Sequence, residues 1–209
     1  MISKIERGEI VAVPVRVLRA VADALGASLD LKLRWHGEGL DRLLDEAHSR
    51  LVEAMVVLLR DAGWDVAVEV SFSIRGERGS IDVLAWHAAT ASLLVIEVKS
   101  VVPDSQATLH GLDRKARLGP QLANERGWEC RNIGRLLVVG ESSTSRLRIS
   151  RLDATYGTAL PDRNNQVRRW IRTPGGPLGG LLFLRNAPVG STKRRSTARE
   201  RVRRPTEPG

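Results

Sequence analysis

The chain alternates between stretches where apolar residues recur every three or four positions and stretches where they alternate or run together. The first pattern is typical of amphipathic helices and the second of strands. The predicted helices cover 14–25, 40–62, 108–126, 144–155 and 162–172. The predicted strands cover 28–35, 64–74, 79–87, 92–99, 133–141 and 179–185.

The elements between residues 38 and 141 follow the order α-β-β-β-α-β. Three successive strands predict a meander, and a helix before the next strand predicts a crossover, which gives an α/β fold with a mixed central sheet flanked by helices. We predict this domain over 38–186, after a small helical N-terminal segment at 1–27 and a strand or linker at 28–37. Residues 187–209 are rich in Pro, Gly, Ser, Thr and Arg, and are predicted to be a disordered tail.

A net charge of +9 favours a polyanionic partner, and nucleic acid is the usual one. The tail contains seven basic and two acidic residues, so +5 of the +9 lies there and +4 lies in residues 1–186. The predicted domain is therefore only mildly basic. DNA is the expected partner, while RNA and a homodimer are left open.

Several classes of protein are excluded by what the sequence lacks. No run approaches the roughly 18–20 apolar residues of a membrane span, and the N-terminus has no signal-peptide pattern. Cys130 is the single cysteine, which excludes an intramolecular disulfide and a zinc cluster built on cysteines. We expect a cytoplasmic protein without a membrane partner.

The strand 92–99 carries Glu97 and Lys99 near the end of an apolar run. Residues two apart in a strand share a face, so both side chains project together. Unpaired charges buried there would destabilise the fold strongly. Either the strand emerges into solvent with an exposed ion pair, worth about 0–1 kcal/mol, or the charges are held rigidly for a function.

A second acid, Asp82, lies in the preceding strand. A turn over residues 88–91 would pair His87 with Ser92 and place Asp82 opposite Glu97, with Cβ atoms about 4.5–5.5 Å apart. Two carboxylates at that distance repel each other. A divalent cation such as Mg²⁺ would remove the repulsion and keep water ligands for a reaction.

The acid-x-Lys pattern is weak by itself, since it occurs at 30–32, 97–99 and 113–115. Only the second instance lies on a core strand that follows another strand with an acid. There Lys99 could orient or deprotonate a water, or neutralise charge that develops on a phosphate.

These residues and this order of elements resemble the PD-(D/E)xK, or restriction-endonuclease-like, nuclease superfamily. The resemblance covers about 38–141 and rests on Asp82, a gap of 14 residues, and Glu97-Val98-Lys99. It implies an αβββαβ core, with Asp82, Glu97 and the Val98 carbonyl as ligands of Mg²⁺ or Mn²⁺ and Lys99 beside the attacking water. Ile81 stands where the family name has Pro.

The resemblance also suggests supporting residues. Some members add an acid from the first helix, for which Glu46 is the catalytic candidate, Asp45 a rival, and a solvated helix-face acid the alternative reading. Lys115 either supports the site from the following helix or is a surface lysine. The predicted nucleic-acid contacts outside the N-terminal segment are Lys115, Arg117, Arg194 and Arg195.

The N-terminal segment resembles the end of a lambda-repressor-like (XRE-type) helix-turn-helix domain. The residues that carry this are ISKIERGEI (2–10) and a helix ending in Ala-Leu-Gly (24–26). The resemblance places Ser3, Lys4 and Arg7 near DNA. The scaffold helices are missing, so we expect either a truncated gene model, which we favour, or a degraded remnant, and no independent DNA binding by 1–27.

Two functions follow from these observations. The first is a DNA-binding protein whose nuclease-like domain hydrolyses phosphodiesters with Mg²⁺ or Mn²⁺. The alternative is an XRE-family transcriptional regulator whose nuclease-fold domain senses or oligomerises without cutting. A third reading is an α/β interaction module with a tail that binds nucleic acid nonspecifically.

Overall fold

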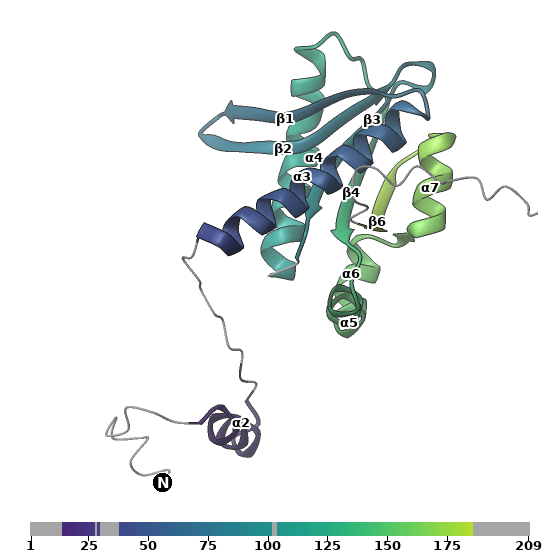
Figure 1. Ribbon diagram of the computed structural model, residues 1–209. Coiled ribbons are helices and arrows are strands. Elements are labelled where there is room, and N and C mark those ends of the chain that lie inside the picture. The colour runs from purple at the N-terminus through teal and green to yellow at the C-terminus, as the bar shows by residue number, and fades with distance from the viewer. Residues whose placement is uncertain (1–13, 28, 30–37, 102–103, 186–209) are drawn as a thin grey trace, which may run out of the picture. The chain divides into compact units, whose positions relative to one another are not determined.

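The computed structural model describes residues 14–27, 29, 38–101 and 104–185 (Figure 1). The described residues fall into two units, which divide between Asp41 and Arg42 near the start of the long helix at 38–60. The predicted helix at 14–25 is present as α2 (Val15–Ala24). The predicted strand at 28–35 lies outside the described residues except for Leu29.

The second unit contains a mixed six-stranded sheet between helices, as predicted. Its strands are in the order β1-β2-β3-β4-β6-β5. Strands β1, β2 and β3 are antiparallel, and β3, β4, β6 and β5 are parallel. The elements are α3 (Glu38–Arg60), β1 (Asp65–Ile74), β2 (Glu77–His87), a 3-10 turn (Ala88–Thr90), β3 (Ser92–Lys99), α4 (Ser105–Asn124), β4 (Asn132–Gly140), α5 (Ser143–Arg151), α6 (Asp153–Ala159), β5 (Asp162–Arg163), α7 (Asn164–Arg172) and β6 (Leu178–Leu184).

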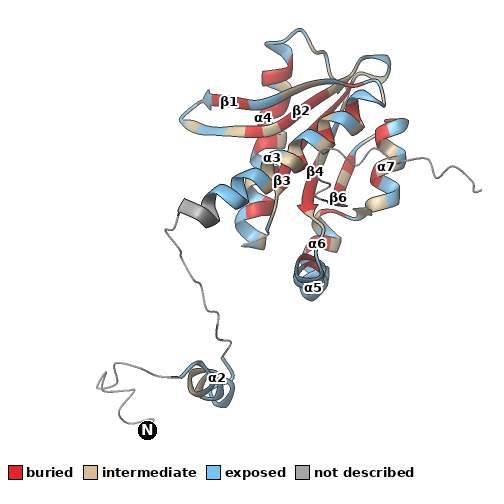
Figure 2. Ribbon diagram, viewed as in Figure 1, coloured by how far each residue is buried: buried red, intermediate tan, exposed pale blue. Residues whose placement is uncertain are grey.

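Helices cover both faces of the sheet and create two apolar cores. On one face Leu51 and Met55 of α3 pack with Ile171 of α7 against alternate strand residues. On the other face the core includes Leu112 of α4 and Tyr156 of α6. Strand β3 is therefore buried on both sides along most of its length (Figure 2). Among the described residues, none of the helices is long and apolar enough to cross a membrane.

Two sequence-based boundaries are corrected. The predicted helix at 144–155 is two helices, because the Leu152 N–H bonds to Ile149 O and tightens the last turn of α5. Asp153 then opens α6, where its charge favours the helix N-terminus over a helix interior. The predicted helix at 162–172 begins at Asn164, after the two-residue strand β5, which is too short to show a periodic pattern.

Helix α4 lies unusually close to the sheet at Gly119. A Cβ added there would be 2.8 Å from Val95 Cγ2 of β3. Lys115 lies one turn earlier, and residues four apart share a helix face, so Lys115 also faces the sheet. The close packing of α4 thus brings a lysine to the strand that carries Glu97.

We expect Gly119→Ala to lower the free energy of unfolding by about 1–3 kcal/mol, because the methyl group meets Val95 and pushes α4 away from β3. Gly111→Ala is the matched control in the same helix, since an added Cβ there has nothing within 4 Å. That change should be neutral or stabilising by up to about 1 kcal/mol. Urea denaturation followed by circular dichroism measures both, and equal stabilities would contradict the packing argument.

Candidate active site at the parting of β2 and β3

The predicted hairpin register is confirmed. Strands β2 and β3 pair from His87↔Ser92 to Val83↔Ile96, around a turn at 88–90. One further step in this register places Asp82 opposite Glu97. Beyond that point β2 continues to pair with β1, and β3 continues to pair with β4, so the two strands part at the two acids.

The strands part because the alternation of side chains along β2 is broken at Asp82, so that the residues on its two sides, Ile81 and Val83, face opposite sides of the sheet. Val83 packs in the core beneath α3 and α7, whereas Ile81 packs in the core beneath α4. Residues two apart in a regular strand would share a face. Glu69, opposite Asp82 in the register of β1 and β2, has a φ of 50°, an uncommon conformation for a residue other than glycine. The local distortion thus affects both strands at the level of Asp82.

The side chain of Asp82 supplies a hydrogen bond to β3 just beyond the point where the backbone of β2 stops pairing with it. Its Oδ2 accepts a hydrogen bond of 2.7 Å from the backbone N–H of Val98. The side chain of one predicted ligand, Asp82, therefore holds the backbone of another, Val98, which lies between Glu97 and Lys99.

Glu97 and two lysines complete the cluster on the α4 side of the sheet. Lys99 Nζ lies 2.7 Å from Glu97 Oε1. Lys115 Nζ of α4 donates to Glu97 Oε2 and lies 3.7 Å from Asp82 Oδ1. The side chain of Lys99 is 34% exposed, whereas those of Glu97 and Lys115 are 8% and 11% exposed. Only one charged group of the cluster reaches well into solvent.

The two carboxyls have opposite pKa shifts. Burial and the charge of Glu97 raise the pKa of Asp82, although the Val98 N–H, Lys115 and His48 oppose them. Burial alone would also raise the pKa of Glu97, but hydrogen bonds from Lys115 and Lys99 outweigh it and hold the pKa below its usual value. Glu97 is thus held ionised, while the charge on Asp82 is disfavoured.

The donor set fits a small hard cation that keeps water ligands. Two carboxylates converge, and Mg²⁺ is typically held by one or two carboxylates together with water. Among the described residues, no group of three or more His, Cys, Asp and Glu side chains converges on one point. An all-protein cage is therefore not built here, and the ammonium of Lys115 is the cation that contacts both acids.

The other predicted site residues lie apart from this cluster. Glu46 is exposed on α3 and pairs with Arg50. Arg117 is exposed on α4 and makes a bidentate pair with Glu77, at 2.8 and 3.0 Å. The remaining predicted nucleic-acid contacts, which are Ser3, Lys4, Arg7, Arg194 and Arg195, lie outside the described residues.

The sequence left Lys115 as either a supporting residue or a surface lysine, and it gave no indication that the charge of His48 acts on Asp82. Lys115 is one of only five lysines among 33 basic residues, and its helix face also carries Gly119. Both signals were available. His48 belongs to α3, and its influence on Asp82 arises only when that helix packs on the sheet. No spacing in the sequence could have shown it.

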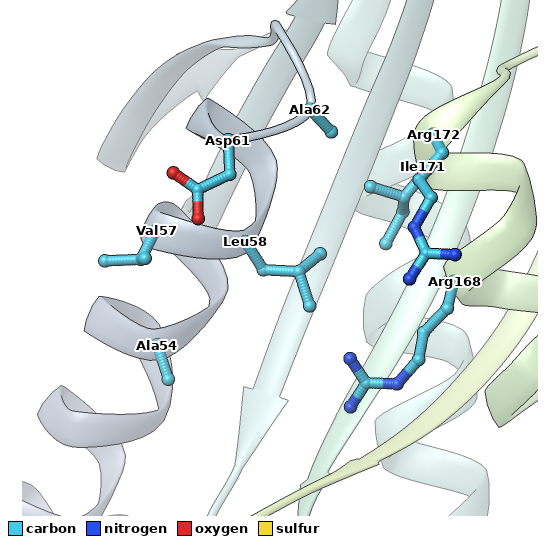
Figure 3. A pocket seen from close by; sticks show the side chains of 8 residues that line it. All are labelled: Ala54, Val57, Leu58, Asp61, Ala62, Arg168, Ile171 and Arg172. Atoms are coloured by element: carbon cyan, nitrogen blue, oxygen red, sulfur yellow. The ribbon is translucent and has the colours of Figure 1, made fainter. Parts of the chain in front are cut away.

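A sizeable groove lies elsewhere in the described part of the structure. It has a volume of about 650 Å³, and α3 and α7 line it with Leu58 and Val57 on one side and Arg168 and Arg172 on the other (Figure 3). None of the four cluster residues lines this groove. The two carboxyls with opposite pKa shifts, Asp82 and Glu97, thus lie at the strands and not in the groove.

Comparisons with protein-family models, with curated proteins and with solved structures found no match. The geometry of Asp82, Glu97, Lys99 and Lys115 is therefore the main indication of function.

We expect Asp82→Asn to raise the melting temperature at pH 7. Asp82 has an ordinary pKa of 3.8 that is raised on folding, so its ionisation lowers stability as the pH rises through 3.8 and beyond. An amide removes this loss while its oxygen still accepts from Val98. The gain should shrink as the pH falls toward 3.8 and vanish well below it, because aspartate then becomes protonated in both the unfolded and the folded state.

Asp113→Asn is the control, since this exposed helix acid pairs only with Arg135 in the described structure. Its effect should stay within about 1 kcal/mol and lack the same pH trend. Thermal melts between pH 4 and pH 8 compare the two variants. A lower melting temperature for Asp82→Asn at pH 7 would show that its charge stabilises the fold.

Proposed function

We propose that residues 38–186 form a PD-(D/E)xK, restriction-endonuclease-like domain that hydrolyses phosphodiesters in DNA with the help of Mg²⁺ or Mn²⁺. The observation that carries the proposal is the meeting of Asp82, Glu97 and Lys99 where β2 and β3 part. The run α3-β1-β2-β3-α4-β4 supports it, because this is the α-β-β-β-α-β order that the resemblance implies.

Asp82, Glu97 and the carbonyl of Val98 are the proposed metal ligands. Bound there, Mg²⁺ or Mn²⁺ would supply Lewis acidity toward a phosphoryl oxygen. The protein contributes a carboxylate that stays ionised, Glu97, whose pKa is held low by Lys115 and Lys99 against the opposing effect of burial. It also contributes a rigid support, since the Val98 backbone is fixed by Asp82.

Lys99 is the proposed catalytic contact to water and phosphate. Its ammonium lies at the solvent-facing edge of the cluster and is oriented by Glu97 Oε1 at 2.7 Å. From there it can donate to an attacking water or to a phosphoryl oxygen, and it favours negative charge that develops during attack. The two carboxylates and two ammonium groups sum to zero charge, so the cluster does not repel a phosphate.

A second candidate is a DNA-binding regulator whose domain does not cut. The observation that favours it is Lys115, which balances the two acids without a metal. Such a buried ion cluster can be a structural element. The helix-turn-helix resemblance of the N-terminal segment is consistent with this role.

Cleavage of a supercoiled plasmid and of a labelled duplex in Mg²⁺ or Mn²⁺ tests the main proposal. We expect Glu97→Gln and Lys99→Met each to lower the cleavage rate by about 10²-fold or more, because the first removes a proposed metal ligand and the second removes the positive charge that acts on the reacting phosphate. Asp113→Asn should leave the rate within about twofold; this residue belongs to another acid-x-Lys pattern, and its side chain lies outside the cluster.

Two results would change the assignment. Equal rates for all variants would remove the cluster from the reaction. An absence of cleavage by every form, together with retained binding to the duplex, would favour the regulator.

The basic tail generates a separate prediction about binding. Each phosphate contact contributes about −0.9 to the slope of log affinity against log salt on duplex DNA. Replacing the seven lysines and arginines of 187–209 with glutamine should therefore make this slope shallower by several such steps. Fluorescence anisotropy in EDTA measures binding without cleavage, and an unchanged slope would show that the tail makes no phosphate contacts.

A further inference from the structure

The ammonium of Lys115 occupies the place between the two acids. It donates to Glu97 Oε2 and lies 3.7 Å from Asp82 Oδ1. The other two carboxylate oxygens are also engaged, because Lys99 contacts Glu97 Oε1 and the Val98 N–H donates to Asp82 Oδ2. A cation that approaches the two acids from the α4 side therefore meets Lys115 first.

Packing holds Lys115 in this position. Its side chain is 11% exposed, and the contact of Gly119 with Val95 keeps α4 close to β3 one turn away. A buried ammonium without its partners would be costly, as would two buried carboxylates without a cation. While both acids are ionised, a positive charge between Asp82 and Glu97 is therefore strongly favoured.

We propose that Lys115 is an internal counter-ion that competes with the divalent metal for Asp82 and Glu97, so that metal binding requires the ammonium to leave the acids. This inference rests on the metal site of the proposed function and adds its regulation. Lys115 acts on the metal through the two acids, and the strength of its contacts with them sets how tightly the metal binds.

Titration with Mn²⁺, followed by calorimetry and by the electron paramagnetic resonance signal of free Mn²⁺, tests the competition. Lys115→Met should bind Mn²⁺ about tenfold more tightly or better than the wild-type chain, since the metal no longer displaces a buried charge. Lys115→Gln, which keeps a neutral hydrogen-bond donor, should change the affinity in the same direction and protects the test against misfolding of the methionine variant.

Arg114→Met is the matched control. It removes one positive charge from the neighbouring position of α4, where the side chain is exposed. Its Mn²⁺ affinity should stay within about twofold of the wild-type value. If Arg114→Met bound Mn²⁺ as tightly as Lys115→Met, the net charge of the protein, and not the contact of Lys115 with the two acids, would set the affinity.

A second readout uses the wild-type chain. Lysine acylation followed by mass spectrometry should label Lys115 several-fold faster with saturating Mn²⁺ than in EDTA, because the displaced amine reaches solvent. Glu97→Gln should lose this metal dependence, since the variant lacks a ligand. The chain has only five lysines, so each site can be followed separately.

Three results would overturn the proposal. Lys115→Met and Lys115→Gln could bind Mn²⁺ no more tightly than the wild-type chain, or Mn²⁺ binding could leave the labelling of Lys115 unchanged. The third result is that the wild-type chain and both variants bind no Mn²⁺. Two outcomes separate this proposal from the proposed function. Tighter Mn²⁺ binding by the Lys115 variants without cleavage by any form would support the counter-ion role and argue against nuclease activity. Cleavage with equal Mn²⁺ affinities would support nuclease activity and argue against the counter-ion role.

Discussion

Two carboxylates and two ammonium groups are held together at the point where β2 and β3 part. Asp82 and Glu97 would repel each other across the hairpin if they were alone. Lys115 and Lys99 offset this repulsion, and the Val98 N–H satisfies the remaining oxygen of Asp82. Lys115 is central to this balance, because without its ammonium the two buried acids would repel each other and Asp82 would lose the lysine that lies 3.7 Å from its Oδ1.

The fold makes the cluster possible by surrounding β3. Parallel pairing with β4 on one side and antiparallel pairing with β2 on the other hold its backbone, while the two cores bury its apolar side chains. Glu97 and Lys99 thus follow a segment of β3 that is paired on both sides up to Ile96, and they remain paired with β4. A site for phosphate chemistry benefits from such support, because pre-positioned charges need little rearrangement during the reaction.

The cluster and the large groove differ in character. The groove between α3 and α7 combines mainly apolar residues with Asp61 and two arginines, whereas the cluster combines acids with lysines at matched charge. The convergence of ionisable groups with shifted pKa values is the more informative sign of chemistry, since it has an energetic cost that apolar packing lacks.

The amino-acid pattern alone predicted the α-β-β-β-α-β order of the elements over 38–141, the mixed sheet and the register of the β2–β3 hairpin, whose pairing ends one residue before Asp82 and Glu97. These are local properties, because periodicity sets each element and the short turn after His87 sets the register. The division into α5 and α6 and the two-residue strand β5 gave no periodic signal. Only the tertiary structure decided that Lys115 joins the acids while Glu46 stays at the surface with Arg50. The physical reason is that a helix side chain reaches a strand only if the helix packs closely enough on the sheet. The distance between α4 and β3 is set by contacts such as that of Gly119 with Val95, which are 24 positions apart in the chain.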